Sequence, residues 1–315
     1  MSHVRDLSEL TLAESALTIG SFDGLHLGHQ ALIRAMVGEA RADRLASVVL
    51  TFFPHPSVVL RGRRPAFYIT QPDEKARLLL ERGVDHVVTQ KFDEALSLVT
   101  ADEFLDRLIR QLGLKHLWVG EDFALGHDRE GNRTFLKRAS VERGFDLHVF
   151  PPVSVGGEVV SSTRVREALR AGDVARVAAY LGRLFSLEGR VVRGAQRGRE
   201  LGFPTANLQL AEDQAYPGRG VYACFATVAA ERHPAVTNVG VRPTFGDNLP
   251  APIVETHLLD VSPDLYEHTL RLEFVERLRE EQRFGGVDAL RAQIALDVER
   301  ARRILDSAGQ AGDGR

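Results

Sequence analysis

The sequence has little cysteine, little lysine and no long hydrophobic run. A single cysteine, Cys224, in 315 residues cannot form a disulfide within the chain. No apolar stretch approaches the roughly 20 residues that a membrane-spanning helix needs. The first fifteen residues carry acidic side chains where a secretory signal peptide has an apolar core. These absences exclude a disulfide scaffold and a membrane span, and they predict a cytoplasmic protein.

Lysine is also unevenly placed along the chain. The four lysines are Lys75, Lys91, Lys115 and Lys137, so the segment after residue 182 has none. P-loop NTPases and protein kinases both place a lysine on the nucleotide phosphates. Both classes are therefore excluded for the second half of the chain. Phosphate chemistry there has to use arginine, backbone N–H groups and a metal ion.

The charge is nearly balanced. The net charge of -3 divides into -1 for residues 1–182, with 23 basic and 24 acidic side chains, and -2 for residues 183–315, with 17 basic and 19 acidic. Neither half has the basic excess of a nucleic-acid-binding protein, so no nucleic-acid partner is expected. A chain of this length exceeds one ordinary core and predicts two domains.

The first half alternates short apolar runs with longer helical segments. Five such pairs in succession predict an α/β domain with a doubly wound parallel sheet. Ligands of these sheets bind beyond the carboxyl ends of the strands. The expected pairs, strand then helix, are 16–20 and 29–43, 45–53 and 73–83, 84–90 and 101–113, 114–120 and 131–144, and 146–151 and 161–173.

After about residue 183 the pattern changes to short alternating runs separated by Gly, Pro and Asn. This texture is typical of an antiparallel sheet or barrel. Apolar residues on one helical face of 287–308 predict a final helix. The expected strands are 186–192, 220–229, 235–240, 254–260 and 270–278.

The motif GSFDGLHLGH, residues 20–29, lies between an expected strand and an expected helix. Its glycines let the backbone approach a ligand closely, and a helix N-terminus attracts phosphate. His26 and His29, three residues apart, can both donate hydrogen bonds to one phosphate group and stabilise the charge that develops on it. The alternative is that one histidine merely caps the helix.

A second helix start, SSTRVR at residues 161–166, offers Ser161 or Ser162 as its N-cap. Arg164 and Arg166 lie in or near the first turn, where a cation opposes the helix dipole unless an anion is bound. Their position therefore suggests an anion site, although a solvated arginine face would give the same pattern.

The second half contains a Gly- and Pro-rich loop, GRELGFPTANL at residues 198–208. Thr205 and Asn207 can present a hydroxyl and an amide oxygen on one side of an extended backbone, which suits Mg²⁺. Glu255, on an expected strand, can act as a general base toward a hydroxyl group. Each residue taken alone also fits a turn or a solvent-facing strand.

GSFDGLHLGH and SSTRVR, together with TFFPHP at 51–56 and VGEDFALGHDREGN at 119–132, resemble the bacterial FAD synthetase branch of the nucleotidyltransferases. The resemblance covers residues 15–182 and implies a Rossmann-like fold. It implies that His26 and His29 contact the ATP phosphates, with Ser162 and Arg166 on the triphosphate. By the same resemblance, His55 lies beside the reacting groups, Gly20, Phe22, Asp23 and Ser161 belong to the phosphate site, and Asp122 and Phe123 line a flavin and adenine pocket.

Residues 183–305 resemble the riboflavin kinase module. The motifs are GRVVRG, RGRELGFPTANL, PGRGVYA, NVGVRPTF and VETHLLD. The resemblance implies a Greek-key barrel that binds riboflavin and MgATP, with Thr205 and Asn207 at the metal ion and Glu255 as the base. It adds Gly202, Phe203 and Pro204 to the ATP and flavin site. Two residues depart from the family pattern: Glu267 stands where a glycine is more common, and Ala195 replaces a common acidic residue.

The chain as a whole therefore resembles the bacterial bifunctional riboflavin kinase/FMN adenylyltransferases. We expect residues 1–182 to convert FMN and ATP to FAD, and residues 183–315 to phosphorylate riboflavin, both with Mg²⁺. We expect a monomer or weak homo-oligomer without a membrane partner. The alternatives are a nucleotidyltransferase for another phosphate acceptor, with a passive barrel, and a non-catalytic flavin or nucleotide sensor.

Overall fold

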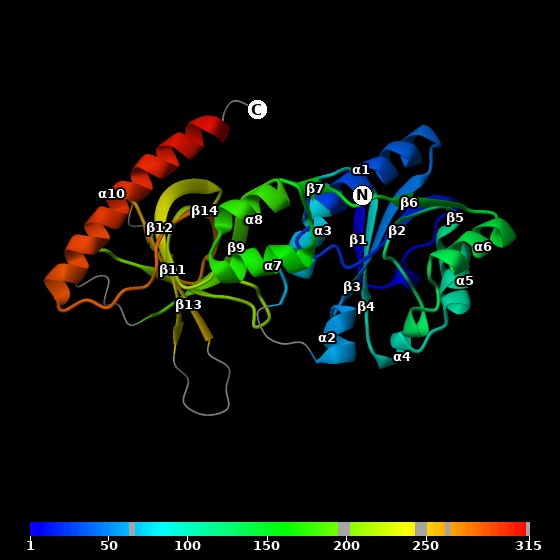
Figure 1. Cartoon of the computed structure of the whole chain (residues 1–315), viewed down its shortest axis with the longest axis horizontal. Coiled ribbons are helices and arrows are strands. Elements are labelled where there is room, and N and C mark those ends of the chain that lie inside the picture. The colour runs from blue at the N-terminus through cyan, green and yellow to red at the C-terminus, as the bar shows by residue number, and fades with distance from the viewer. Residues whose placement is uncertain (63–66, 195–201, 243–250, 262–264, 313–315) are drawn as a thin grey trace. The chain divides into compact units, whose positions relative to one another are not determined.

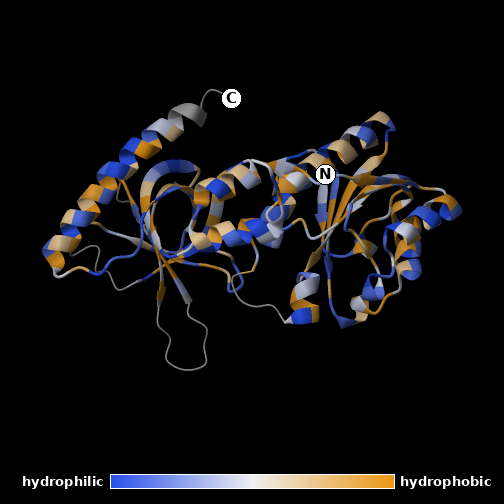
Figure 2. Ribbon diagram, viewed as in Figure 1, coloured by the Kyte–Doolittle hydropathy of each residue, from blue (hydrophilic) through white to orange (hydrophobic). Residues whose placement is uncertain are grey.

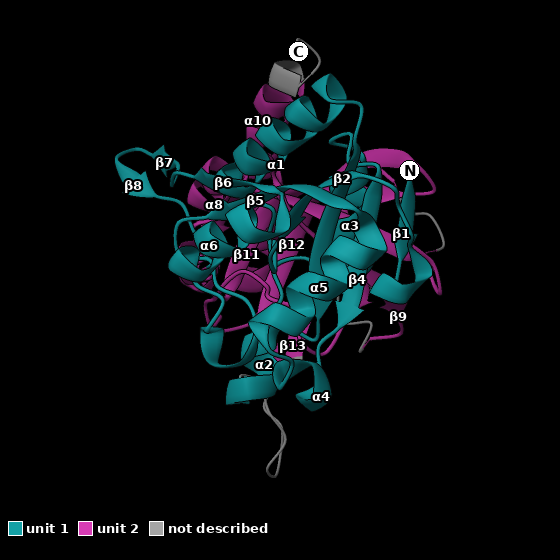
Figure 3. Cartoon of the chain, turned by 90° about the vertical axis from the view of Figure 1, so that its right-hand side faces the viewer, with its two compact units in different colours: residues 1–64, 68–162 teal, residues 65–67, 163–315 magenta. Residues whose placement is uncertain are grey.

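The computed structural model describes residues 1–62, 67–194, 202–242, 251–261 and 265–312. The chain divides into two compact units, shown in Figure 3. Unit 1 holds residues 1–64 and 68–162, and unit 2 holds residues 65–67 and 163–315. Within the described residues, no helix combines the length and the apolar character that a membrane span requires.

Unit 1 is built on a six-stranded parallel sheet with the strand order β1-β4-β3-β2-β5-β6 (Figure 1). The predicted parallel sheet is confirmed. Its strands are β1 (Ser2–Val4), β2 (Ser15–Ile19), β3 (Ala46–Phe53), β4 (His86–Lys91), β5 (Leu114–Gly120) and β6 (Asp146–Phe150). Its helices are α1 (Leu27–Ala42), α2 (Pro56–Arg61), α3 (Pro72–Leu80), α4 (Glu94–Ser97), α5 (Ala101–Leu112) and α6 (Arg133–Arg143).

Side chains alternate between the two faces of this sheet, as the two-residue period of a strand requires. On β2, Leu17 packs with α5 and α6, whereas Ala16 packs with α1 and α3. On β3, Val48 and Val49 divide in the same way. Both faces are therefore covered by helices, and the central strands β2 and β3 are mostly apolar and buried. Figure 2 shows hydrophobic and hydrophilic stretches within the sheet.

The limits of α5 show how local sequence fixes an element. Thr100 caps its N-terminus, and the side chain of Glu103 reaches back to the Thr100 backbone in a capping box. Gly113 ends the helix with φ near 55°. A Cβ at that position would lie 1.9 Å from the carbonyl oxygen of Ala13, so only glycine fits.

Two short pieces of sheet in unit 1 were not predicted. β1, of three residues, pairs with β4 at the sheet edge. The hairpin of β7 (Ser154–Val155) and β8 (Glu158–Val159) precedes α7. Neither run is long enough for a two-residue period to stand out in the sequence.

Unit 2 is a closed antiparallel barrel with the order β10-β13-β12-β11-β14-β9. The predicted antiparallel barrel and terminal helix are confirmed, but residues 206–208, predicted as part of a loop, belong to a strand that pairs on both sides. The strands are β9 (Phe185–Val192), β10 (Ala206–Gln209), β11 (Gly220–Val228), β12 (Glu231–Arg242), β13 (Ala251–Leu258) and β14 (Thr269–Arg279), and the helices are α7 (Ser162–Ala171), α8 (Val174–Leu181) and α10 (Val287–Gly312).

Strand β11 is buried on both sides because α10 covers the outside of the barrel wall. Ala223 and Phe225 pack in one cluster with Ala301 and Leu305 of α10. Cys224, between them, is fully buried and faces the other way. Hydrophobic and hydrophilic residues alternate along α10 in Figure 2, as expected for a helix with one packed face.

The compact units divide about twenty residues earlier than the predicted domain boundary at 182/183. α7 and α8 belong to unit 2. The backbone N–H of Gly218 donates to the carbonyl oxygen of Leu169 at 2.7 Å, and Nη1 of Arg277 donates to the carbonyl oxygen of Ala171 at 3.4 Å. These contacts attach α7 to the barrel. Where the two activities divide along the chain stays a prediction.

Candidate functional site

Three predicted motifs leave the sheet of unit 1 at its carboxyl edge. Gly20 follows β2 directly, His55 lies two residues after β3, and Gly120 ends β5. β2 lies between β3 and β5, and the chain passes from β4 on one side to β5 on the other. Open α/β sheets bind ligands at such a reversal of strand order. The three motifs therefore leave the sheet where a nucleotide site is expected.

The loop from β2 to α1 is compact and partly left-handed. Phe22, Gly24 and Leu25 have φ angles of 44°, 79° and 44°, and a non-glycine residue in this region marks a loop held by its surroundings. The ring of Phe22 is 3% exposed and lies against Gly20, where a Cβ would approach it to 3.1 Å. Phe22 and Gly20 thus shape the loop from inside.

Asp23 anchors this loop to the segment before α3. Its carboxylate is buried and accepts hydrogen bonds from the backbone N–H groups of Ile69 and Thr70, at 3.0 and 3.1 Å. Its carbonyl oxygen accepts the hydroxyl of Ser162 at 2.8 Å. Asp23 and Ser162 are therefore joined, and both hold the backbone of the loop.

His26 and His29 lie together at the start of α1. His26 is the N-cap, and its Nδ1 accepts the backbone N–H of His29 at 3.4 Å. The two rings are stacked with 3.6 Å between centroids. His26 therefore caps the helix, as the alternative interpretation proposed for one histidine. The two histidines still lie side by side at one helix N-terminus.

Both imidazoles are neutral at pH 7. Burial lowers the pKa of His26 to about 4, against a smaller opposing effect of Asp23. Burial, with His26 and Lys75 nearby, holds the pKa of His29 well below its ordinary value. Nδ1 of His29 is buried and has no hydrogen-bond partner among the described residues. The ring of Phe22 packs edge-on against His29, 5.1 Å between centroids.

Lys75 is a member of this site that the sequence analysis missed. It lies on α3, is 4% exposed, and donates from Nζ to the carbonyl oxygen of Ser21 at 2.9 Å. Burial lowers the pKa of Lys75 to about 8, and Asp23 opposes that shift. A signal was present, because Lys75 shares a helix face with Leu78 and Leu79 at spacings of three and four residues.

The motif SSTRVR crosses the division between the units, with Ser161 and Ser162 in unit 1 and Arg164 and Arg166 in unit 2. Nε of Arg166 donates to the carbonyl oxygen of Phe67 at 2.7 Å. Its guanidinium lies over the Phe67 ring, 4.0 Å from the centroid. Within unit 2, these two contacts fix the direction of Arg166.

The other predicted residues of the first site occupy separate loops. His55 caps α2, its Nδ1 accepting from the backbone N–H of Ser57 at 3.1 Å. Phe123 is half-buried against the core beneath the sheet. Asp122 is exposed, and its carbonyl oxygen accepts from Arg129 at 2.7 Å. Among the described residues, Asp122 and Phe123 form no hydrogen bond, ion pair or ring contact with the histidine pair.

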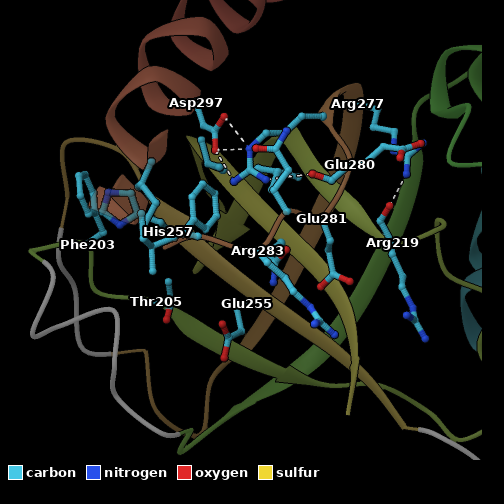
Figure 4. A pocket seen from close by; sticks show the side chains of 18 of the residues that line it. Phe203, Thr205, Arg219, Glu255, His257, Arg277, Glu280, Glu281, Arg283 and Asp297 are labelled. Carbon is cyan, nitrogen blue, oxygen red and sulfur yellow. Dashed lines mark hydrogen bonds and ion pairs between the residues drawn. The ribbon is translucent and has the colours of Figure 1, made fainter. Parts of the chain in front are cut away.

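Unit 2 contains a cavity of about 890 Å³ over the outer wall of the barrel. The predicted residues Phe203, Thr205 and Glu255 line it (Figure 4). Thr205 directly precedes β10, whose Ala206 pairs with Thr256, the neighbour of Glu255. The structure thus brings the loop motif and the strand motif to one cavity.

Asn207 lies beside this group. In the barrel register, Asn207 is opposite Glu255, and Glu255 is opposite Asn238 on the next strand. Ala206 and Leu208 are buried in the barrel, so alternation places Asn207 on the outer face with Glu255. A Cβ at Gly194 would lie 2.2 Å from the Asn207 amide, so this glycine leaves room for that side chain.

The segment Gly202–Pro204 is held against β13. The carbonyl oxygen of Pro204 lies 2.8 Å from Nδ1 of His257, which donates to it, and the rings of Phe203 and His257 meet edge to face at 5.5 Å. Gly202 has a φ of 86°. The first four residues of the predicted loop, 198–201, lie outside the described residues, as does Ala195.

Charged side chains surround the cavity, and five arginines line it together with His257 and several carboxylates. Arg279 pairs with Asp297 of α10 at 2.8 Å, and Arg277 lies 3.6 Å from Glu280. Arg219 and Arg283 also line the cavity and have no ion-pair partner in the part of the chain that the structure describes. Arginine thus supplies the positive charge, as the absence of lysine requires.

Both halves of the chain match models of known protein families. The family model for FAD synthetase matches residues 9–164, and that for riboflavin kinase matches residues 181–305. A crystal structure described as a macrolide-efflux protein from Streptococcus pneumoniae is similar with a TM-score of 0.87 and 30% identity, over 96% of this chain and 98% of that one.

Curated relatives match along nearly the whole chain. The bifunctional riboflavin kinase/FMN adenylyltransferase of Escherichia coli K12 is 40% identical over 304 residues, 96% of each chain. Those of Pseudomonas fluorescens and Bacillus subtilis are 40% and 33% identical, over 91% and 98% of this chain and 92% and 98% of theirs. The chain therefore belongs to the bifunctional riboflavin kinase/FMN adenylyltransferase family.

Proposed function

We propose that the two activities of this family are carried by the two sites described above. As a member of the family, the chain phosphorylates riboflavin to FMN and adenylylates FMN to FAD. Adenylyl transfer is assigned to the loop between β2 and α1, and phosphorylation to the barrel cavity. The observation that supports this division best is that Thr205 and Glu255 line one cavity, whereas His26 and His29 stack at a helix N-terminus.

The two histidines act as neutral donors. Nδ1 of His26 accepts a hydrogen bond, so the proton of that ring is on Nε2. Nδ1 of His29 is buried without an acceptor among the described residues, and an unsatisfied buried N–H is costly, so its proton is also on Nε2. Both Nε2–H groups can then donate to phosphate oxygens without any change of protonation state.

In adenylyl transfer, a phosphate oxygen of FMN attacks the α-phosphorus of ATP in line. The bond from the α-phosphorus to the bridging oxygen breaks, and pyrophosphate leaves with its electron pair. The protein forms no covalent bond. Its contribution is to hold the reactants and to stabilise negative charge through His26, His29 and the N-terminus of α1.

The remaining residues of the first site have supporting roles. Gly20, Phe22 and Asp23 remain assigned to the phosphate site, where the Phe22 ring beside Gly20 and the Asp23 carboxylate support the loop. Ser161, Ser162 and Arg166 remain assigned to the triphosphate. His55 is placed beside the reacting groups, and Asp122 and Phe123 in the flavin and adenine pocket.

In the barrel cavity, Glu255 takes the proton of the ribityl hydroxyl as its oxygen attacks the γ-phosphorus of ATP, and ADP leaves. Thr205 and Asn207 offer a hydroxyl and an amide oxygen beside the Glu255 carboxylate. An all-oxygen set of this kind fits Mg²⁺, which would neutralise phosphate charge when bound. Gly202, Phe203 and Pro204 form the nearby ATP and flavin wall.

An assay with separate substrates tests the proposal. The protein is supplied with MgATP and either riboflavin or FMN, and products are separated by chromatography. Riboflavin should give FMN and then FAD, and FMN should give FAD directly. Chelation of Mg²⁺ should stop both reactions. Formation of FMN without FAD would contradict the assignment of adenylyl transfer to the loop between β2 and α1. We also propose that the enzyme is cytoplasmic and works as a monomer or weak homo-oligomer.

A further inference from the structure

A second cluster of chemically active side chains lies at the opposite end of α1. His116 on β5 and His148 on β6 are on adjacent parallel strands, where His116 pairs with Asp146 and Trp118 pairs with His148. Leu117 packs on the α5 side of the sheet, so alternation places His116 and Trp118 on the α1 side. Glu39, from α1, completes the group.

Three atoms of this cluster form a small triangle. Nε2 of His148 lies 3.4 Å from Nδ1 of His116 and 3.3 Å from Oε2 of Glu39. The third side, from Nδ1 of His116 to Oε2 of Glu39, is 3.9 Å. Ligands of a tetrahedral zinc ion, bound at about 2.0–2.1 Å, lie about 3.3 Å apart. The spacing therefore matches three corners of such a site.

Neighbouring groups hold the three ligands in place. Oδ2 of Asp43 lies 3.3 Å from Nε2 of His116; a carboxylate there keeps the proton on Nε2 and turns the Nδ1 lone pair toward the triangle. The indole N–H of Trp118 donates to Oε2 of Glu39 at 2.7 Å. The same indole stacks on His148, 4.4 Å between centroids and 7° between planes.

We propose that Glu39, His116 and His148 bind a divalent transition-metal ion with the preferences of zinc. Two imidazole nitrogens and a carboxylate oxygen are a donor set that such ions favour over Mg²⁺. Oδ2 of Asp146, 3.6 Å from Nδ1 of His116, is available for the fourth position. A proton shared between Nδ1 of His116 and Nε2 of His148 would link only those two atoms. A metal ion would bind both nitrogens and Oε2 of Glu39.

This site is separate from the nucleotide chemistry. Glu39 lies thirteen residues after His26 along α1, or about 20 Å at 1.5 Å per residue. Its ion would tie the C-terminal end of α1 to β5 and β6. We therefore assign it a stabilising role: it steadies the helix that carries the two phosphate-site histidines.

The chain carries its own reporter, because Trp118 is its single tryptophan. The test titrates the full-length, metal-free protein with Zn²⁺ and, separately, with Mg²⁺. We expect Zn²⁺, at micromolar concentration, to change the Trp118 fluorescence to an endpoint of one ion per chain and to raise the melting temperature. Mg²⁺ at the same concentration should do neither. No fluorescence change with Zn²⁺ would overturn the proposal.

Variants locate the ion. Glu39→Gln keeps an acceptor for the Trp118 indole but removes the charge, and His148→Gln removes one nitrogen ligand. By calorimetry we expect each to weaken Zn²⁺ binding at least tenfold, and Asp43→Asn to weaken it less. His233→Gln, on the barrel, is the matched control and should bind as the parent does. Circular dichroism checks that each variant folds. Undiminished Zn²⁺ binding in both ligand variants would overturn the proposal: the ion would bind elsewhere, and Glu39, His116 and His148 would form only an ion-pair network.

Discussion

Unit 1 and unit 2 surround their candidate sites with different kinds of polar group. In unit 1, His26 and His29 are neutral, and the charged Lys75 is buried against a backbone carbonyl. In unit 2, the cavity wall carries arginines and carboxylates, several of them in ion pairs. The first site therefore presents neutral imidazoles held by the fold, whereas the second is lined by charged side chains.

This difference follows from the structural elements that carry the two sites. In unit 1, His26 and His29 are buried within the loop that follows β2, and this burial drives both imidazoles to their neutral form. The outer wall of a small barrel is open to water until α10 covers it, so charged side chains are tolerated. Variants should therefore separate the two activities cleanly.

The largest expected effect is on phosphorylation. Glu255→Gln keeps the size of the side chain but removes the base, and it should reduce FMN formation by about 10²–10⁴-fold. FAD formation from supplied FMN should be unchanged, because that reaction is assigned to unit 1. Initial rates with each substrate measure both. A kinase rate equal to that of the parent would remove Glu255 from its role.

The complementary variant is His29→Ala. Loss of one fixed donor to the phosphates should slow adenylyl transfer by about 10²–10³-fold, while riboflavin phosphorylation continues at the parent rate. The same two assays apply, with circular dichroism to confirm the fold. If both rates fell together in a folded variant, the division into two sites would be wrong.

Lys75→Met tests the residue that only the structure brought to light. Its Nζ hydrogen bond to the carbonyl oxygen of Ser21 holds the loop between β2 and α1. Loss of a charged donor should slow adenylyl transfer about tenfold. The pKa of Lys75 is about 8, so the ammonium group loses its proton as pH rises through 8. The advantage of the parent over the variant should therefore shrink between pH 7 and 9. An equal advantage across that range would count against a charged Lys75.

The sequence predicted most of the architecture because the helical and strand patterns of apolar residues extend over enough residues to be recognised. The five strand and helix pairs correspond to real elements from β2 to α7, and the alternating runs correspond to barrel strands. β1, the hairpin of β7 and β8, and β10 were missed, because runs of two to four residues carry no clear period. The assignment of α7 and α8 to a compact unit depends on contacts such as that of Gly218 with Leu169, which no local pattern contains.

The sequence predicted only those site residues that belong to recognisable motifs. Thr205 and Glu255 were found separately, and the cavity that joins them arises from barrel closure. His257 and Asn238 enter that wall through strand register alone. Lys75 was passed over because a lysine on a helix is ordinarily solvated. The neutral state of His26 and His29 depends on burial, which sequence does not measure.

A smaller effect concerns stability in acid. The pKa of His26 is near 6.5 in the unfolded chain and about 4 when folded, so between these values the unfolded chain binds a proton that the folded chain excludes. The free energy of unfolding should fall by up to about 3 kcal/mol as pH drops from 6.5 to 4, and His26 should have no effect above that window. Urea unfolding followed by Trp118 fluorescence measures it for unit 1.

His26→Asn is the control for this measurement. Asparagine is a preferred N-cap and does not titrate, so the variant keeps the helix start while losing the proton linkage. The stability of unit 1 should then depend less steeply on pH in the same window. The same steepness in parent and variant would mean that other groups cause the acid effect.

The smallest expected effect is in unit 2, at a turn residue with a left-handed backbone. Glu267 has a φ of 68°, which costs a residue with a Cβ roughly 1 kcal/mol. Glu267→Gly removes that cost, but it frees the unfolded chain by about 0.5–1 kcal/mol and deletes an exposed ion pair with Arg190 worth under about 1 kcal/mol. These terms nearly cancel, so calorimetry should find a change within about 1 kcal/mol and an unchanged kinase rate. A slower kinase would instead place this turn among the parts of unit 2 that the reaction uses.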